Sequence, residues 1–163
     1  MSAEAPSARF YHLTRSPLEA MLPPLIARAR GAGWRVAVRA VTPDRLAALD
    51  DSLWLVPGDG FLPHGVAGGP FDADQPVLLT LGGALPNGAT CLMAVEGAQV
   101  QPAEAAALAR VCVIFDGTDP AAVAGARAQW KALTDHGIAA QYWSEESGRW
   151  QMKSERVVQT PPG

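Results

Sequence analysis

One stretch of the chain places basic and aromatic side chains at helical spacing. Within residues 120–135, Val123, Arg127, Trp130 and Lys131 stand at i, i+4, i+7 and i+8, and therefore on one helix face. Arg127 and Lys131 can bind acidic side chains or a terminal carboxylate, and Trp130 can wall an apolar pocket. The pattern is compatible with a partner surface. The alternative is that Trp130 is core, because an apolar stripe also includes Val123, Ala126 and Leu133.

A second candidate surface lies in a long loop rich in glycine and proline, residues 54–75. Loops of this length are usually functional or disordered, but Trp54 and Phe61 make this one unlike a disordered linker. Exposed aromatic rings either fold onto the domain or meet a partner. Pro57 and Pro63 stiffen the loop and so lower the entropy lost on binding. We expect His64 to hydrogen-bond to loop backbone rather than to act on a substrate.

The residues needed for catalysis or nucleotide binding are not found in a suitable pattern. The turn at residues 13–17 (LTRSP) has no glycine, whereas a dinucleotide site needs glycines there so that backbone can approach the pyrophosphate. The three histidines are scattered, and the pairs Asp50-Asp51 and Glu145-Glu146 are interpreted as surface charge. We therefore expect no intrinsic enzyme activity, no cofactor and no metal. The alternative is a small Rossmann-like nucleotide-binding or hydrolytic enzyme that uses the 54–75 loop as a lid.

Composition sets further bounds on function. The 163 residues include 48% hydrophobic and 18% charged side chains, as in one folded domain, and the formal net charge of −3 disfavours direct, tight DNA binding. Cys91 and Cys112 lie in apolar runs and are predicted to be reduced core thiols, with a disulfide between them as the alternative. The sequence shows no signal peptide and no apolar run of about 20 residues, so we expect a cytoplasmic protein without a membrane segment.

The elements that would position these residues alternate between strands and helices. Thr42-Pro43 and Asp119-Pro120 combine a helix N-cap with proline in the first turn, and Ser16-Pro17 is interpreted in the same way. We predict a single domain over 1–163, with loose tails at 1–7 and 154–163. Its fold class is α/β: a Rossmann-like three-layer fold with a mostly parallel sheet and a C-terminal hairpin. Strands are predicted at 9–13, 34–41, 77–80, 91–95, 111–115, 138–144 and 149–153, and helices from 17, at 43–53, 102–109 and 120–135.

Three segments together resemble a known family. They are RFYHL (residues 9–13), LDDSLWLVPGDGFLPHGVAG (residues 49–68), and ARAQWKALTDHG (residues 126–137) with the closing YW…GRWQMK segment. Their order and spacing are similar to those of the DNA polymerase III chi subunit family, over essentially the whole chain from Phe10 to Lys153. The most specific part is the L-W pair followed by F-x-P-H, at residues 53–54 and 61–64.

The resemblance implies an adaptor without a nucleotide site. Chi proteins bind the acidic C-terminal tail of single-stranded DNA-binding protein and link it to the clamp-loader complex of DNA polymerase III. By resemblance the tail site is Val123, Arg127, Trp130 and Lys131, although Val123 and Thr134 stand where some members have basic residues. The second interface, for a psi subunit or an XPD-like helicase, corresponds to Trp54, Phe61, Pro63 and His64.

Overall fold

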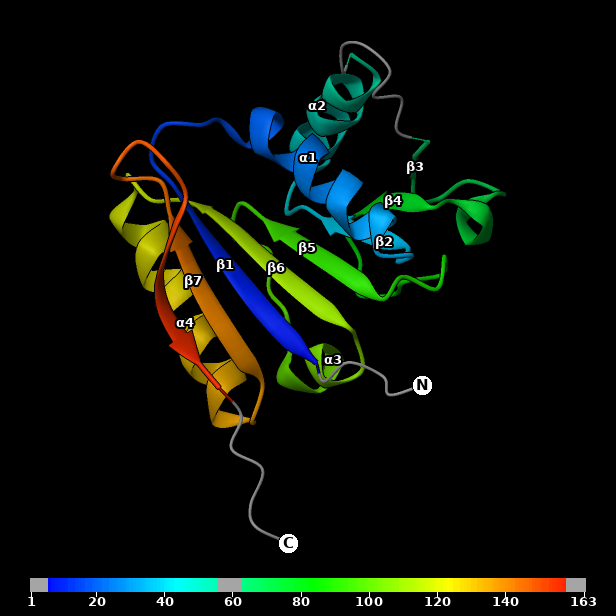
Figure 1. Ribbon diagram of the computed structural model, residues 1–163. Coiled ribbons are helices and arrows are strands. Elements are labelled where there is room, and N and C mark those ends of the chain that lie inside the picture. The colour runs from blue at the N-terminus through cyan, green and yellow to red at the C-terminus, as the bar shows by residue number, and fades with distance from the viewer. Residues whose placement is uncertain (1–5, 56–62, 158–163) are drawn as a thin grey trace, which may run out of the picture.

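The computed structural model describes residues 6–55 and 63–157, and these residues share one sheet (Figure 1). The strand order is β3-β4-β2-β5-β6-β1-β7-β8, and all neighbours are parallel except the antiparallel pair β7-β8. The strands are β1 (Ser7–Leu13), β2 (Val36–Arg39), β3 (Gly65–Val66), β4 (Val77–Thr80), β5 (Cys91–Val95), β6 (Arg110–Asp116), β7 (Ala139–Ser144) and β8 (Gln151–Arg156). The helices are α1 (Leu18–Gly31), α2 (Pro43–Trp54), the 3-10 turn η1 (Asp72–Asp74), α3 (Pro102–Ala106) and α4 (Pro120–Asp135).

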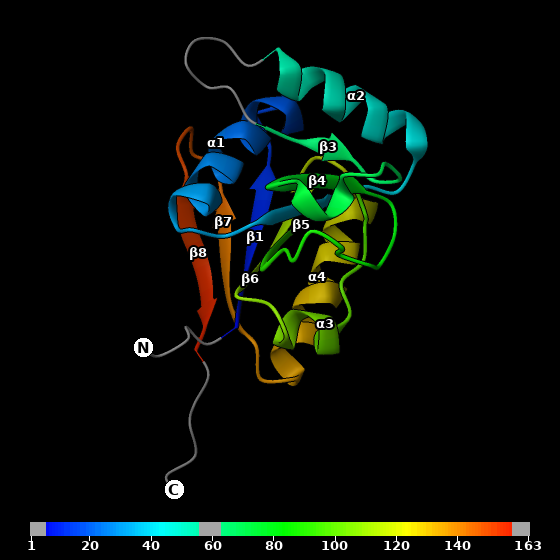
Figure 2. The same ribbon diagram turned by 90° about the vertical axis from the view of Figure 1, so that its right-hand side faces the viewer.

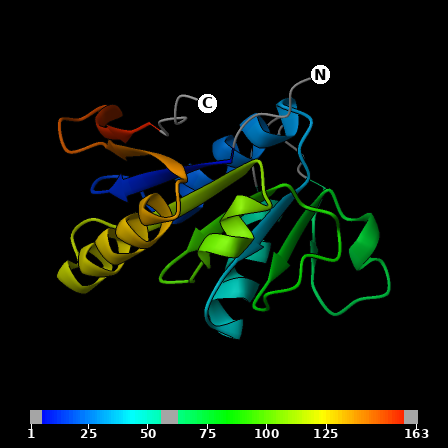
Figure 3. The same cartoon turned by 90° about the horizontal axis from the view of Figure 1, so that it is seen from below.

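The helices form a layer on each face of the sheet, as predicted. Apolar residues of α1 and α2 pack with one face of the strands, while α3 and α4 pack with the other. Figure 3 shows α1 and α4 on opposite sides of β1. Figure 2, in which β3 and β4 face the viewer, shows the β7-β8 hairpin at the far edge. Strands β2, β4 and β5 are buried along their whole length, and they are apolar except for Arg39 and Thr80 at the ends of β2 and β4.

The helix starts follow the predicted N-caps at two of three places. The Thr42 hydroxyl accepts from the Arg45 amide at 3.3 Å, and the Asp119 carboxylate accepts from the Ala121 amide at 3.0 Å. The prediction for Ser16-Pro17 was wrong, because α1 begins at Leu18 with Pro17 as its N-cap and no side-chain cap. Ser16 is turned instead toward Glu145, as described below. The same helix continues through Pro23-Pro24 without ending there.

Other boundaries differ from prediction by a few residues. The first strand begins at Ser7, the second is limited to Val36–Arg39, and α3 ends at Ala106. The last strand is Gln151–Arg156, so the predicted loose tail from Ser154 was wrong at its start, because β8 pairs with β7 as far as Arg156. The long loop also contains the short strand β3, which pairs with β4. Cys91 and Cys112 are buried and free, which confirms the prediction of reduced core thiols.

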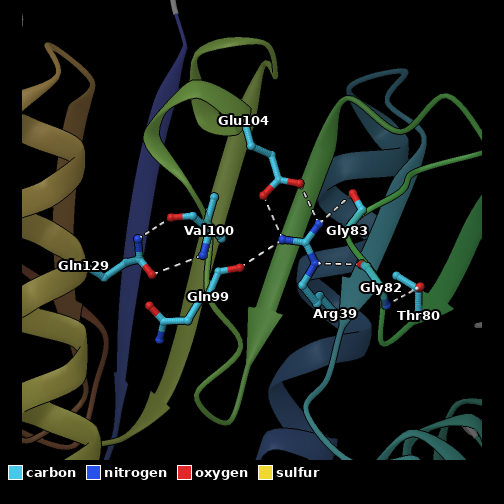
Figure 4. A network of polar contacts seen from close by, with 8 residues as sticks. All are labelled: Arg39, Thr80, Gly82, Gly83, Gln99, Val100, Glu104 and Gln129. Carbon is cyan, nitrogen blue, oxygen red and sulfur yellow. Dashed lines mark hydrogen bonds and ion pairs between the residues drawn. The ribbon is translucent and has the colours of Figure 1, made fainter.

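A buried arginine ties the sheet to the loops on the α3 side (Figure 4). Arg39, at the end of β2, is 6% exposed and donates to both carboxylate oxygens of Glu104 in α3, at 2.8 and 2.6 Å. It also donates to three backbone carbonyls, those of Gly82, Gly83 and Gln99. The next residue, Val100, exchanges two hydrogen bonds with the buried Gln129 side chain of α4. Because three backbone oxygens and a carboxylate accept from its guanidinium group, Arg39 is fully hydrogen-bonded although it is buried.

Candidate partner-binding surfaces

The outer face of α4 presents a partly buried aromatic residue. The Trp130 ring lies 5.3 Å from the Phe10 ring of β1 and 6.2 Å from the Tyr142 ring of β7, both in edge-to-face geometry. Val123, two turns earlier in α4, is also partly buried and packs on the same core. The fully buried side of the helix consists of Ala126, Gln129 and Leu133. Trp130 therefore belongs to the margin of the core, and its remaining surface borders the exposed side of α4.

Two cations stand next to this aromatic margin. Arg127 and Lys131 are both exposed, and Lys131 Nζ lies 2.7 Å from the Asp135 carboxylate one turn later. Burial raises the pKa of the Tyr142 hydroxyl, and the positive charge of Arg127 partly opposes that rise. Arg127 is thus close enough to Tyr142 to act on it electrostatically. The four residues predicted from helical spacing lie on one side of α4, with Val123 and Trp130 packed against the core and the two cations exposed.

Sequence spacing did not reveal two further residues of this surface. The Tyr142 hydroxyl lies 2.6 Å from His12 Nδ1, and the His12 ring lies 5.3 Å from the Phe115 ring. Gly117 gives the His12 ring its space, because a Cβ at this position would overlap the imidazole. Tyr142 reaches Trp130 only because β7 lies beside β1 and under α4. No short-range pattern in the sequence carries that information.

The second predicted surface lies at the end of α2. Trp54 is 52% exposed, and its ring lies 4.3 Å from the ring of buried His64, while Pro63 is exposed. His64 Nε2 is 2.9 Å from the Asp50 carboxylate of α2, so His64 contacts a helix side chain, and the predicted bond to loop backbone stays a prediction. Asp50 is correspondingly not a purely solvated charge. Phe61, the other aromatic residue predicted here, lies outside the described residues.

The two surfaces lie on different layers of the fold. Trp54 ends α2, whose buried leucines pack on the α1 face of the sheet, whereas Trp130 belongs to α4 on the opposite face. The strand order also separates them, because α2 contacts β3 and β4 at one edge and α4 contacts β6, β1 and β7. Two partners bound at these places would not compete for the same residues.

A hollow of about 440 Å³ lies at the carboxyl ends of β1 and β6. The chain leaves β1 toward α1 on one face and leaves β6 toward α4 on the other, and such a switch point is where nucleotides bind in related folds. Here the amides of the first turn are already occupied. Glu145 Oε1 accepts from the amides of Thr14 at 3.1 Å, Arg15 at 2.6 Å and Ser16, and Glu145 Oε2 accepts from the Ser16 hydroxyl at 2.8 Å.

Glu145 therefore stands where an external anion would otherwise find amide donors. The prediction that it is a surface charge was wrong, since the residue is 3% exposed. Its burial by itself raises the carboxyl pKa, but the amides of Ser16, Arg15 and Thr14 and the Ser16 hydroxyl favour the ionised form and together lower that pKa below its usual range. Of the two arginines that line the same hollow, Arg45 is paired with Glu19 at 2.6 Å and Glu96 at 2.8 Å, and the other is Arg15.

The enzyme alternative would use the 54–75 loop as a lid over this hollow. The described part of that loop lies away from the hollow. Residues 65–66 form β3 at the sheet edge, separated from β6 by β4, β2 and β5. Within residues 6–55 and 63–157, no group of three or more histidine, cysteine or carboxylate side chains could hold a metal ion. In the same part of the chain, no helix has the length and apolar character needed to cross a bilayer.

Comparison with known proteins shows the family to which the chain belongs. The family model described as DNA polymerase III chi subunit, HolC, matches residues 6–141. The chain belongs to the DNA polymerase III chi subunit family. A comparison with curated proteins gave no match.

Membership in the chi family connects the chain with DNA polymerase III and DNA replication. The matched segment contains the α4 residues Val123 to Lys131 and the residues Trp54, Pro63 and His64 of the second surface. Tyr142, the aromatic neighbour of Trp130, falls just beyond it. This part of the α4 surface is therefore seen in the tertiary structure and not in the family match.

Proposed function

We propose that the chain is a non-catalytic accessory subunit of DNA polymerase III, acting in the cytoplasm, that links the clamp-loader complex to the acidic C-terminal tail of single-stranded DNA-binding protein. The observation that carries this proposal is the position of exposed Arg127 about one helical turn before partly buried Trp130, whose ring packs against that of Tyr142. Family membership supports the wider assignment to the polymerase.

The α4 surface offers complementary groups for each part of such a tail. The planar guanidinium of Arg127 can hold the terminal carboxylate through two parallel hydrogen bonds. The open edges of Trp130 and Tyr142 can cover the last apolar side chain, beside partly buried Val123. Lys131 can pair with the acidic residues that precede the last apolar residue of the tail. Its present ion pair with Asp135 is solvent-exposed at both side chains and is therefore easily exchanged.

Arg127→Ala is expected to weaken binding of the tail peptide by about 1–3 kcal/mol, the range for a charge-assisted hydrogen bond in a partner site. Removing the last apolar residue of the peptide is expected to abolish binding. Isothermal titration calorimetry with the tail peptide measures both effects, and affinity should fall as salt rises. A folded Arg127→Ala protein that binds like the parent would show that the site lies elsewhere.

Trp54→Ala provides the matched control, because its partly exposed ring lies on the other layer. We expect its tail-peptide affinity to stay within about 0.5 kcal/mol of the parent, as for distant, independent sites. The same change should weaken recovery of the second partner, a psi subunit or an XPD-like helicase, in a pull-down from the host. A large loss of peptide affinity in folded Trp54→Ala would mean that the two surfaces act as one.

The absence of catalysis is part of the proposal and rests on the occupied turn between β1 and α1. Because the Glu145 carboxylate holds the turn amides, nucleotides and dinucleotides are expected to leave the melting temperature unchanged in a thermal-shift screen. A saturable rise in melting temperature that disappears on changing Arg15 or Ser16 would instead favour the nucleotide-binding alternative.

A further inference from the structure

Four arginines gather at the amino ends of the central strands, on a part of the molecule that neither partner surface uses. Arg9 of β1 and Arg110 of β6 are diagonal neighbours on the α1 face, since Arg110 pairs with Ser7 two residues before Arg9. Arg28, in the last turn of α1, lines the same hollow of about 100 Å³. An adjoining hollow of about 220 Å³ shares Arg9 and Arg110 and adds Arg156 at the end of β8. We call Arg9, Arg28, Arg110 and Arg156 the basic track.

The guanidinium groups of the basic track form no close ion pair in the part of the chain that is described. None of the four has a carboxylate within 4.0 Å among residues 6–55 and 63–157. Two acids lie farther away: Glu155 lines the larger hollow and accepts from the neutral Gln141 amide, and Asp135 accepts from Lys131, while the charge of Arg156 also lowers the pKa of the Asp135 carboxyl. This contrasts with Arg39 and Arg45, each of which meets carboxylates at 2.8 Å or less.

Within the track, Arg110 has close side-chain contacts with its neighbours. Arg110 Nε donates to the Ser7 hydroxyl at 3.1 Å, and its guanidinium lies 5.1 Å from the centroid of the Trp34 ring. Burial raises the pKa of Tyr11, and the positive charges of Arg9 and Arg110 oppose that rise. Arg9 and Arg110 are each partly buried. An anion binds more favourably to partly buried cations that have no close counter-charge, because solvent screens the attraction only weakly there.

We propose that the basic track binds the phosphate backbone of single-stranded DNA. Arg9, Arg28 and Arg110 border one hollow on the α1 face, and Arg156, which pairs with Ala140 on the α4 face, borders the second. The two hollows share Arg9 and Arg110, which suits successive phosphates of an extended strand. The hollows are smaller than the roughly 300 Å³ at which pockets for enclosed ligands begin. A flexible strand is preferred to a duplex, because a rigid duplex would reach past this short track toward the acidic remainder of a protein with net charge −3.

The binding is sequence-independent and strongly salt-dependent. For a single strand, the logarithm of the association constant falls with the logarithm of salt by about 0.7 per neutralised phosphate. Three or four contacts therefore give a slope of about −2 to −3. The moderate number of contacts explains how such binding coexists with an acidic net charge: it is weak at physiological salt and becomes measurable at low salt.

Fluorescence anisotropy with a labelled oligo-dT of about 20 nucleotides tests the proposal on the full chain, from about 50 mM to about 200 mM NaCl. Arg28→Glu, at an exposed position, should weaken binding about tenfold at the lowest salt and flatten the slope by about 0.7 or more. Arg110→Gln should act in the same direction. Arg127→Glu, the matched charge reversal on α4, should leave the oligonucleotide affinity within about twofold while it abolishes tail-peptide binding.

Each other outcome overturns the proposal. If the parent protein gives no anisotropy change at about 50 mM NaCl, or a change that does not decrease as salt rises, the site does not exist. Equal losses in Arg28→Glu and Arg127→Glu would mean that only net charge matters. If Arg28→Glu loses the acidic tail peptide and keeps the oligonucleotide, the track is a peptide site. A duplex of the same length that binds as tightly as oligo-dT would remove the preference for single strands.

Discussion

Replacing Arg39 with methionine is expected to lower the free energy of unfolding by about 3–5 kcal/mol. The change removes the partner of Glu104, whose side chain is 21% exposed, and leaves three backbone carbonyls without their donor. The hydrogen bond from Arg39 holds the pKa of the Glu104 carboxyl below its usual range, so Glu104 is ionised at neutral pH and would remain as an uncompensated charge. Urea denaturation at pH 7 measures the loss.

Arg45→Met is the matched control for this prediction. Arg45 also meets two carboxylates, those of Glu19 and Glu96, but its side chain is 38% exposed, so its loss should cost less than about 1 kcal/mol. The double change Arg39→Met with Glu104→Leu should recover part of the stability, because it removes the orphaned charge. Equal costs for Arg39→Met and Arg45→Met would show that burial does not distinguish the two networks.

Glu145→Gln is expected to lower the free energy of unfolding at pH 7 by about 2 kcal/mol, the range for hydrogen bonds to a buried charged group. The substitution keeps the size of the side chain but removes the charge that accepts from Thr14, Arg15 and Ser16. Because the folded-state pKa is lowered, the contribution of the carboxylate is fully present above its ordinary value of 4.5. It is lost as pH falls from that value through the lower folded-state pKa.

The parent and Glu145→Gln proteins should therefore converge in stability as the pH is lowered below about 4.5. Denaturation at several pH values checks this. Glu146→Gln, one residue along and 59% exposed at its side chain, is the control and should change stability by no more than about 0.5 kcal/mol at pH 7. A stability difference for Glu145→Gln that is independent of pH would contradict the role assigned to its charge.

The partner surfaces differ in how far local sequence patterns predict them. The α4 face could be identified because residues four, seven and eight positions apart lie together on any helix, whatever the rest of the fold does. The N-caps at Thr42 and Asp119 are local in the same sense, since they depend on contacts two or three residues along the chain. Arg127 and Trp130 are accordingly found where their spacing placed them.

Ser16 shows where a local pattern misleads. Its sequence context is that of an N-cap, yet its hydroxyl donates to Glu145 at the end of β7, 129 residues away in the chain. The competing partner is brought there by the pairing of β1 with β7. The Ser16 side chain is directed to this charged acceptor, and α1 begins without a side-chain cap.

The sequence by itself determined, to within a few residues, the described strands other than β3 and the four α-helices. It also determined that the first strand–helix turn lacks the glycines of a nucleotide site and which side chains share the α4 face. Only the tertiary structure decided the neighbours of those elements. The strand order, with β1 between β6 and β7, brings Tyr142 to Trp130, Glu145 to the first turn, and Arg9 beside Arg110. The reason is that periodicity reports which face of an element is apolar, whereas strand order depends on how the crossover helices pack on the whole sheet, a property that no single segment of the chain contains.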